Sequence, residues 1–297
     1  MEKIVKEILK SKGIDFKYIV KANAGFTSIV YIVDDNYVIK LASSEIGKQK
    51  LEKEVNVYSF LNDERFPELV ATGDYDKYKY LIITKILGKS LYDIWHYIPE
   101  SERFSCVKQI CEILRIFHSQ SVAVLHSEFV EKDFAGKIKN ELFTSLNCLE
   151  QNDSVSKTKE FLNGNFDKFV TNNNLKVIYN DIHFDNFIYN EGKVYLIDFD
   201  RVEVYPFEYE HLILLLMCEK PDKFAGESNY MLVRDEDFKN VYAYFKECYE
   251  QMFQIENLKE KLEIFKLNYL IEQALETKNK EWQDKLIYNF NEFFGLE

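Results

Sequence analysis

Three polar residues within one short stretch of the sequence could do chemistry together. Asp181 and Asn186 have four residues between them, and Asp198 directly follows the apolar stretch 194–197. A carboxylate and an amide oxygen are hard ligands that suit Mg²⁺, and a second carboxylate can align a hydroxyl group and accept its proton. These residue types together favour phosphoryl transfer, in which a metal ion bridges phosphate oxygens while a hydroxyl attacks.

Short strands must hold these three residues on one platform. The stretches 176–179, 186–189 and 194–197 are rich in β-branched and aromatic residues, and we expect each to form a strand. Asp and Asn are also common turn residues, so any one of the three alone would have an ordinary structural explanation. The interpretation therefore depends on their joint spacing.

The rest of the chain divides into a strand-rich front and a helix-rich back. In the front, we expect a hairpin with its turn at 34–36, a helix over 44–61 and strands near 69–72 and 80–84. Beyond Gly88 the apolar residues recur at helical spacing, most clearly over 104–117. This order predicts an α+β fold with two segregated lobes.

The segment Asn-Asp-Ile-His-Phe-Asp-Asn at 180–186 resembles the HGDxHxxN loop of aminoglycoside phosphotransferases and choline kinases. That family has a protein-kinase-like fold and transfers a γ-phosphoryl group to a small hydroxylated molecule. The resemblance implies that Asp181 is the catalytic residue that orients the acceptor hydroxyl and accepts its proton. It also implies that Asn186 and Asp198 hold Mg²⁺.

The resemblance extends over nearly the whole chain and implies a nucleotide site. Lys40 is similar to the strand lysine that contacts the α- and β-phosphates, and Glu54 to the helix glutamate that pairs with it. The pairing has a physical purpose, because a buried lysine without a partner tends to lose its charge. Gly25 and Ser28 lie in the segment that resembles the phosphate-covering turn. Backbone groups near Thr84 and Ile86 lie where the hinge that meets the purine edge is expected.

The sequence departs from the family pattern at three places. Tyr179 occupies the position of the usual histidine of the HGD motif, which braces the loop. Asp200 replaces the glycine of a DFG motif. Glu210 stands where the family often has aspartate, and we expect this longer carboxylate still to brace the catalytic loop. His118 and His183 are expected to be structural rather than reactive.

The resemblance implies a fold with two lobes. We expect an N-terminal nucleotide-binding lobe at 1–86, formed by an antiparallel sheet and a helix. A larger, mainly helical C-terminal lobe at 87–297 would carry the catalytic loop and the acceptor site. The nucleotide, ATP or GTP, would bind between the two lobes.

The composition bounds the partners and the location of the protein. The net charge of −12 argues against nucleic-acid binding and favours a cationic small substrate, although many cytosolic bacterial proteins are simply acidic. The five cysteines lack metal-site spacing and are expected to be reduced thiols in the core. Residues 1–12 form an amphipathic pattern without a signal-peptide segment, and the longest apolar run, 212–218, is too short for a membrane span. We therefore expect a cytoplasmic protein that does not associate with membranes.

The expected function is phosphorylation of a small, cationic acceptor, with an aminoglycoside antibiotic as the first choice and antibiotic resistance as the consequence. A choline, amino-alcohol or sugar-metabolite kinase fits the same loop. A protein kinase is disfavoured because no APE-like motif or activation segment follows Asp198. A pseudokinase that only binds nucleotide is favoured by Tyr179 and the glycine-poor phosphate turn. The retained set of five polar residues opposes it. The acceptor, the choice between ATP and GTP and the oligomeric state stay open.

Overall fold

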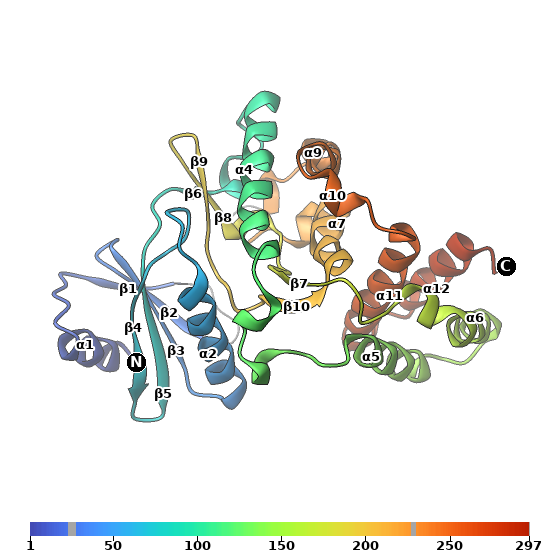
Figure 1. The fold of residues 1–297 in the computed structure, drawn as a ribbon, viewed down its shortest axis with the longest axis horizontal. Coiled ribbons are helices and arrows are strands. Elements are labelled where there is room, and N and C mark those ends of the chain that lie inside the picture. Colours follow the sequence, from blue (N-terminus) through green and yellow to red (C-terminus); the bar gives the residue numbers. More distant parts are fainter. Residues whose placement is uncertain (23–27, 227–229, 297) are drawn as a thin grey trace.

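A five-stranded antiparallel sheet forms the front of the molecule. The computed structural model describes residues 1–22, 28–226 and 230–296 (Figure 1). The strand order is β1-β2-β3-β5-β4, and the predicted hairpin of β2 and β3 turns through Asp34 and Asp35, both with positive φ. The strands are β1 (Ile19–Lys21), β2 (Ile29–Val33), β3 (Tyr37–Ala42), β4 (Leu69–Tyr75) and β5 (Tyr78–Thr84).

Two helices cover opposite faces of this sheet. Helix α1 (Glu2–Ser11) packs Val5, Ile8 and Leu9 against alternate residues of β2, β3 and β5. Helix α2 (Glu45–Phe60) starts at Ser44, whose hydroxyl caps the N–H of Gly47 at 3.2 Å, and faces the remaining residues of β3 and β5. Because side chains alternate along a strand, this arrangement directs residue 40 of β3 toward α2.

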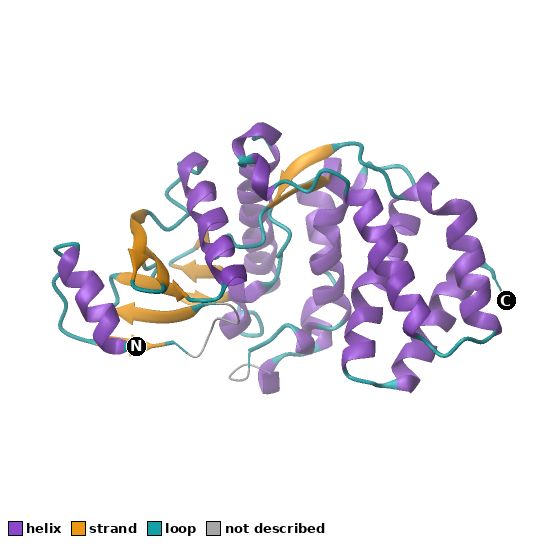
Figure 2. Ribbon diagram, turned by 90° about the horizontal axis from the view of Figure 1, so that it is seen from below, coloured by secondary structure: helices purple, strands orange, loops and turns teal. Residues whose placement is uncertain are grey.

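The chain after β5 is mainly helical and lies to one side of the sheet (Figures 1 and 2). Helices α5, α6, α11 and α12 stand side by side at the end farthest from the sheet, as Figure 2 shows. The helices are α3 (Leu91–Ile94), α4 (Glu100–His118), α5 (Phe134–Cys148), α6 (Asp153–Phe169), α7 (His211–Glu219), α8 (Asp235–Phe238), α9 (Val241–Cys248), α10 (Glu250–Phe253), α11 (Leu258–Glu276) and α12 (Lys280–Phe294).

Two small sheets lie beside α4, apart from the first sheet. The expected strands β7 (Leu175–Ile178), β8 (Phe187–Asn190) and β9 (Lys193–Leu196) are present. Strand β8 pairs with both β9 and β6 (Lys89–Ser90), and β7 pairs antiparallel with β10 (Glu203–Pro206). The sequence analysis did not predict β1, β6 or β10. These strands have two to four residues, and they form through pairing with distant segments rather than through a local pattern.

One continuous apolar core joins the α2 face of the large sheet to the helical part. It contains Leu81 and Ile83 of β5 together with the predicted apolar side of α4. The described cysteines are free thiols, and Cys106 and Cys111 are buried as expected. Cys148 is exposed at the end of α5, so the prediction that all five cysteines are core residues is wrong at this position.

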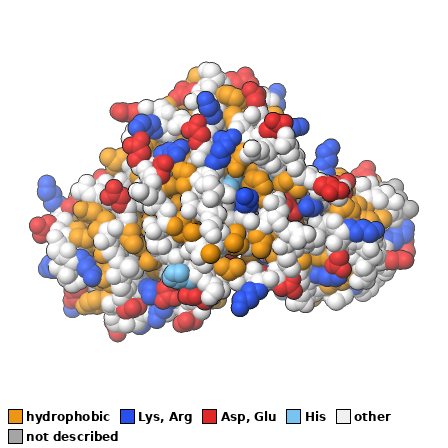
Figure 3. Space-filling view, in the orientation of Figure 1, with side chains coloured by type: hydrophobic (Ala, Val, Ile, Leu, Met, Phe, Trp, Pro, Cys, Tyr) orange, Lys and Arg blue, Asp and Glu red, His pale blue; other side chains and the backbone are white. Residues whose placement is uncertain are grey.

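The surface carries charges of both signs. On the face shown in Figure 3, acidic and basic side chains are interspersed among apolar ones. Within the described residues, no helix is long and apolar enough to cross a membrane.

Candidate active site

The loop between β7 and β8 brings Asp181 and Asn186 together. The side-chain amide of Asn186 donates hydrogen bonds to the Asp181 carboxylate at 2.9 Å and to the Asp181 carbonyl at 3.2 Å. Nε2 of His183 lies 3.0 Å from the Asn186 amide and 3.4 Å from the Asp181 carboxylate. The five-residue separation in sequence therefore becomes direct contact, and His183 shapes the loop from within.

Asp198 lies beside this loop at the end of β9. The N–H of Ile197 donates to the carbonyl of Asn186 at 3.0 Å, which joins the two segments. Asp198 has φ of +65°, a left-handed conformation that is strained for a non-glycine residue and often marks a functional position. The adjacent Phe199 is buried against Tyr58 of α2 and fixes this turn in the core.

Lys40 connects Asp198 to the large sheet. The buried ammonium group donates to the two oxygens of Glu54 at 2.8 and 3.0 Å and to Asp198 at 3.0 Å. Burial alone would lower the pKa of Lys40, but Asp198 and Glu54 raise it above its ordinary value. Burial raises the pKa of Glu54 to about 7, because Lys40 offsets only part of the desolvation. Burial would likewise raise the pKa of Asp198, but Lys40 lowers it overall.

Glu210 braces the backbone before Asp181. Its two carboxylate oxygens accept hydrogen bonds from the N–H groups of Tyr179 and Asn180, each at 2.8 Å. Nε2 of His118 lies 2.9 Å from the same carboxylate, and all of these groups are buried. Asn180 has φ of +58°, so the carboxylate holds the chain in a strained turn. The expected bracing role of Glu210 agrees with these contacts, and His118 supports it.

The residues expected around the nucleotide lie at the two ends of the interior strands β2 and β5. Ser28 directly precedes β2, whereas Gly25 lies outside the described residues. Thr84 ends β5, and its N–H already donates to the carbonyl of Glu68 at 3.0 Å. Within the described parts of the chain, the backbone groups of Ile86 make no hydrogen bond, so they are free to meet a purine edge.

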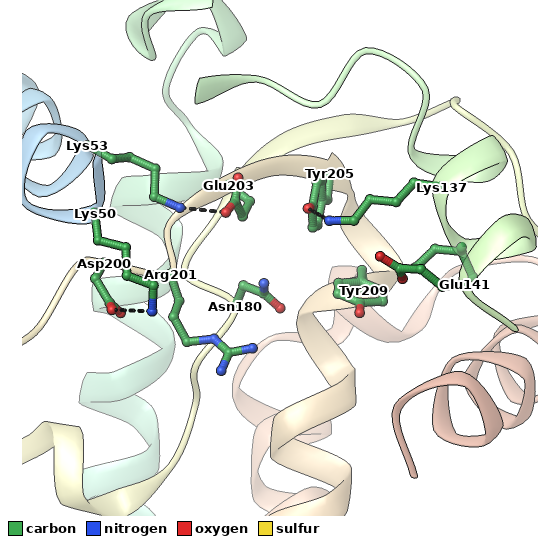
Figure 4. Close-up of a pocket in the computed structure, with 11 residues that line it drawn as sticks. Lys50, Lys53, Lys137, Glu141, Asn180, Asp200, Arg201, Glu203, Tyr205 and Tyr209 are labelled. Carbon is green, nitrogen blue, oxygen red and sulfur yellow. Dashed lines mark hydrogen bonds and ion pairs between the residues drawn. The ribbon is translucent and has the colours of Figure 1, made fainter. Parts of the chain in front are cut away.

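Arg201 is a residue near Asp181 that the sequence analysis missed. Its Nε lies 3.9 Å from the Asp181 carboxylate, in a cavity of about 300 Å³ bounded by α2, α5 and β10 (Figure 4). Burial would lower the pKa of Arg201, but Asp181 raises it overall. The one available signal was its position directly after the acidic residue Asp200.

The other cations of this cavity already have partners. Lys50 pairs with Asp200 at 2.9 Å and Lys53 with Glu203 at 2.5 Å, as the dashed lines in Figure 4 show. Lys53 lies on a helix rich in charged residues, yet it is largely buried because β10 supplies its partner. Among the described residues, no group of three or more His, Cys, Asp and Glu side chains could hold a metal ion.

Comparison with known proteins decides the family. Residues 19–232 match the model of the phosphotransferase enzyme family. The chain belongs to this family. The predicted enzyme class, a phosphotransferase that acts on an alcohol group, is confirmed by this match. No curated protein gives a significant sequence match to this family member.

Solved structures confirm the fold of this phosphotransferase. It resembles the GDP and kanamycin complex of APH(2'')-IIIa with a TM-score of 0.66 and 17% identity over 97% of each chain. It resembles the streptomycin–ATP ternary complex of APH(2'')-IIa with a TM-score of 0.67 and 18% identity over 96% of each chain. Macrolide 2'-phosphotransferase MphH from Brachybacterium faecium has a TM-score of 0.57 and 9% identity over 97% of each chain. The predicted α+β, protein-kinase-like fold is confirmed.

Proposed function

We propose that this phosphotransferase transfers the γ-phosphoryl group of ATP or GTP to a hydroxyl of a small molecule, with Mg²⁺ as cofactor. The observation that carries the proposal is one set of side-chain contacts, joined by the backbone hydrogen bond from Ile197 to Asn186. Glu54 holds Lys40, Lys40 reaches Asp198, Asp198 lies beside Asn186, and Asn186 holds Asp181. Every charged group that phosphoryl transfer needs is thus present within one network.

The donor nucleotide binds between a lobe at 1–86 and a lobe at 87–297. Lys40 contacts the phosphates, and Glu54 keeps its ammonium group charged and in place. Gly25 and Ser28 belong to the turn that covers the phosphates. Thr84 and Ile86 mark the hinge, where Ile86 supplies backbone groups to the purine edge. The neighbouring solved structures contain GDP, ATP or ADP, which supports a nucleoside triphosphate as donor.

The described residues fit a magnesium ion. The Asn186 amide nitrogen is occupied by Asp181, and its oxygen makes no hydrogen bond to any described residue. The Asp198 side chain is 44% exposed and keeps carboxylate oxygen accessible beside Lys40. Amide and carboxylate oxygens are ligands that Mg²⁺ prefers, with phosphate oxygens and water completing the set. When bound, the ion would neutralise the negative charge of the phosphate oxygens.

Asp181 orients the attacking hydroxyl and accepts its proton. Asn186 and His183 fix its carboxylate from one side, and Arg201 lies on the other. A base held in this way loses little freedom when the acceptor binds, which is a major source of rate in transfer between two bound substrates.

The likenesses make aminoglycosides the first acceptors to test. Solved relatives are complexes with kanamycin, streptomycin and gentamicin, and the net charge of −12 suits a polycation in solution. Choline, other amino alcohols and sugar metabolites are the alternatives that the same loop permits. The resemblance to a macrolide phosphotransferase supports a wider choice still.

A nucleoside-diphosphate release assay tests the proposal. The protein is given ATP or GTP, Mg²⁺ and a panel of aminoglycosides, choline, ethanolamine, sugar alcohols and macrolides. We expect acceptor-dependent release that falls at least about a thousandfold in Asp181→Asn. Asp198→Ala should lose metal-dependent nucleotide binding or turnover. Asp167→Asn, which changes an exposed carboxylate on α6, is the matched control and should keep full turnover. Full turnover by Asp198→Ala would refute the assignment.

A further inference from the structure

A second cavity, of about 600 Å³, lies among α7, α11 and α12. Its walls are mainly apolar and aromatic, and include Phe224, Leu267, Leu270, Trp282 and Leu286. Both its volume and its lining are typical of sites that bury most of a small molecule. A ligand in this cavity would place a hydrocarbon or ring surface against these side chains.

This cavity reaches the catalytic loop. The ring of Phe224, at its edge, lies 6.4 Å from the ring of His183, and His183 lies 3.4 Å from the Asp181 carboxylate. Tyr269 also lines the cavity, and it is close enough to Arg201 to affect the pKa of its guanidinium group. Burial would lower the pKa of Arg201, but Asp181 and then Tyr269 raise it. A molecule that fills the cavity can therefore extend one hydroxyl toward Asp181.

The charged side chains of the cavity are predominantly basic. Four lysines and two glutamates line it. Glu219 and Glu263 both accept from Lys266, at 2.9 and 3.3 Å, and this single ammonium group balances one of their two negative charges. Within the described residues, Lys220 and Lys285 have no ion-pair partner. The four lysines and two glutamates therefore leave the cavity lining with a net charge of +2.

The cavity of about 300 Å³ that Arg201 lines does not offer an excess of negative charge either. Its carboxylates Asp200 and Glu203 are neutralised by lysines, whereas Glu141 has no ion-pair partner among the residues that the structure describes. Arg201 already lies beside the Asp181 carboxylate, and the positive charge of Lys137 offsets the negative charge of Glu141. A polycation would meet no net negative charge in the lining of either cavity, so it would not recover the hydration that it loses on binding.

We propose that the acceptor is a hydroxylated molecule with an apolar ring system and an acidic group, rather than a polyamine sugar. This inference rests on the proposed phosphotransfer function and names its substrate class. The ring system packs against Phe224 and Trp282, the acidic group lies at the lysines of the rim, and a hydroxyl meets Asp181. In the transfer step the hydroxyl oxygen bonds to the γ-phosphorus, the bond to the nucleoside diphosphate breaks, and Asp181 takes the proton.

Trp282 provides a readout of binding that does not depend on catalysis. The chain has two tryptophans, and the other, Trp95, is buried away from the cavity lining. We would titrate the protein, with Mg²⁺ and nucleotide present, with three steroids that share one ring system and its hydroxyls. The series is cholate, its methyl ester and the corresponding primary amine, with kanamycin as the polycation. Trp282→Phe shows whether the fluorescence change comes from this cavity.

We expect cholate to bind most tightly, the ester less tightly and the amine least. In the double variant Lys220→Glu and Lys285→Glu, cholate should lose about tenfold in affinity and the amine should gain affinity. Lys259→Glu, an exposed lysine of α11 outside the cavity lining, is the matched control and should leave the order unchanged.

Two sets of outcomes separate this inference from the proposed function. Tighter binding of kanamycin than of cholate, no binding of any steroid at millimolar concentration, or an unchanged order in the double variant would overturn the inference. If Trp282 fluorescence shows the expected order of affinities but no acceptor stimulates nucleoside-diphosphate release, phosphotransfer would be overturned instead. Release stimulated by cholate and abolished by Asp181→Asn would support both.

Discussion

The hydroxyl of Tyr179 donates a hydrogen bond to the carbonyl oxygen of Ile197 at 3.1 Å. Tyr179 directly follows β7, and Ile197 directly precedes Asp198, so this bond ties the start of the catalytic loop to the strained turn beside it. The ring of Tyr179 is fully buried. The departure from the usual histidine therefore retains a bracing function.

Replacement of Tyr179 by phenylalanine tests this bond. The ring keeps its packing, but the carbonyl of Ile197 loses its donor, so the free energy of unfolding should fall by about 1–2 kcal/mol and turnover should fall with it. Denaturant unfolding and kcat measure the two effects. Tyr244→Phe removes a hydroxyl bonded to Glu100 at the surface and should cost less than about 0.5 kcal/mol. Equal losses in the two variants would contradict the bracing role.

Glu210 and His118 should act as a coupled pair. Glu210→Gln places an amide N–H against one of two backbone donors, and we expect a loss of about 2–4 kcal/mol in the free energy of unfolding. A double-mutant cycle with His118→Ala should give a coupling of at least about 0.5 kcal/mol, because the two side chains are in direct contact. Additive losses would show that His118 does not support the carboxylate.

Stability should depend on pH through Glu54. Burial raises its folded-state pKa to about 7, above the value of about 4.3 that a carboxyl has in an unfolded chain. Between these values the folded state keeps a proton that the unfolded state has released. The free energy of unfolding should therefore fall by up to about 3 kcal/mol as the pH rises from about 5 to 7, and level off above.

Denaturant unfolding of the wild type and Glu54→Gln at a series of pH values measures this dependence. The variant cannot ionise at residue 54, so its stability should change less between pH 5 and 7. Glu52→Gln, on the same helix and partly exposed in its pair with Lys79, is the matched control. Parallel pH profiles for the wild type and Glu54→Gln would show that another group titrates.

Arg201 should affect turnover more than nucleotide affinity. Its guanidinium lies beside Asp181, away from the contacts between Lys40 and Glu54. Arg201→Gln should lower kcat by about tenfold to a hundredfold, with KM for the nucleotide nearly unchanged. Lys137→Gln changes a cation of the same cavity that is hydrogen-bonded to Tyr205, and it should have a smaller effect. An equal drop in both variants would show that only the overall charge of the cavity matters.

The sequence by itself determined the parts of the site that chemistry and local pattern fix. Asp181, Asn186 and Asp198 stand at spacings set by one loop and one short hairpin, so their types and separations sufficed to predict where they lie. Lys40 and Glu54 were predicted from the resemblance to the phosphotransferase family, and strand alternation places Lys40 on the face of the sheet that meets Glu54. Local hydrophobic patterns predicted the α+β order, and the resemblance of the loop at 180–186 predicted the family.

Tertiary structure decided which charges remain available. The strand that buries Lys53 lies 150 residues farther along the chain, and Arg201 meets Asp181 only because β10 returns beside β7. The net charge of −12 does not specify which carboxylates form ion pairs in the folded protein. Lys266 pairs with both Glu219 and Glu263 in a largely apolar cavity, so the electric field that an acceptor meets is set by side-chain pairing across helices. Coulomb energy depends on distance in space and on burial, and the linear sequence specifies neither for residues far apart.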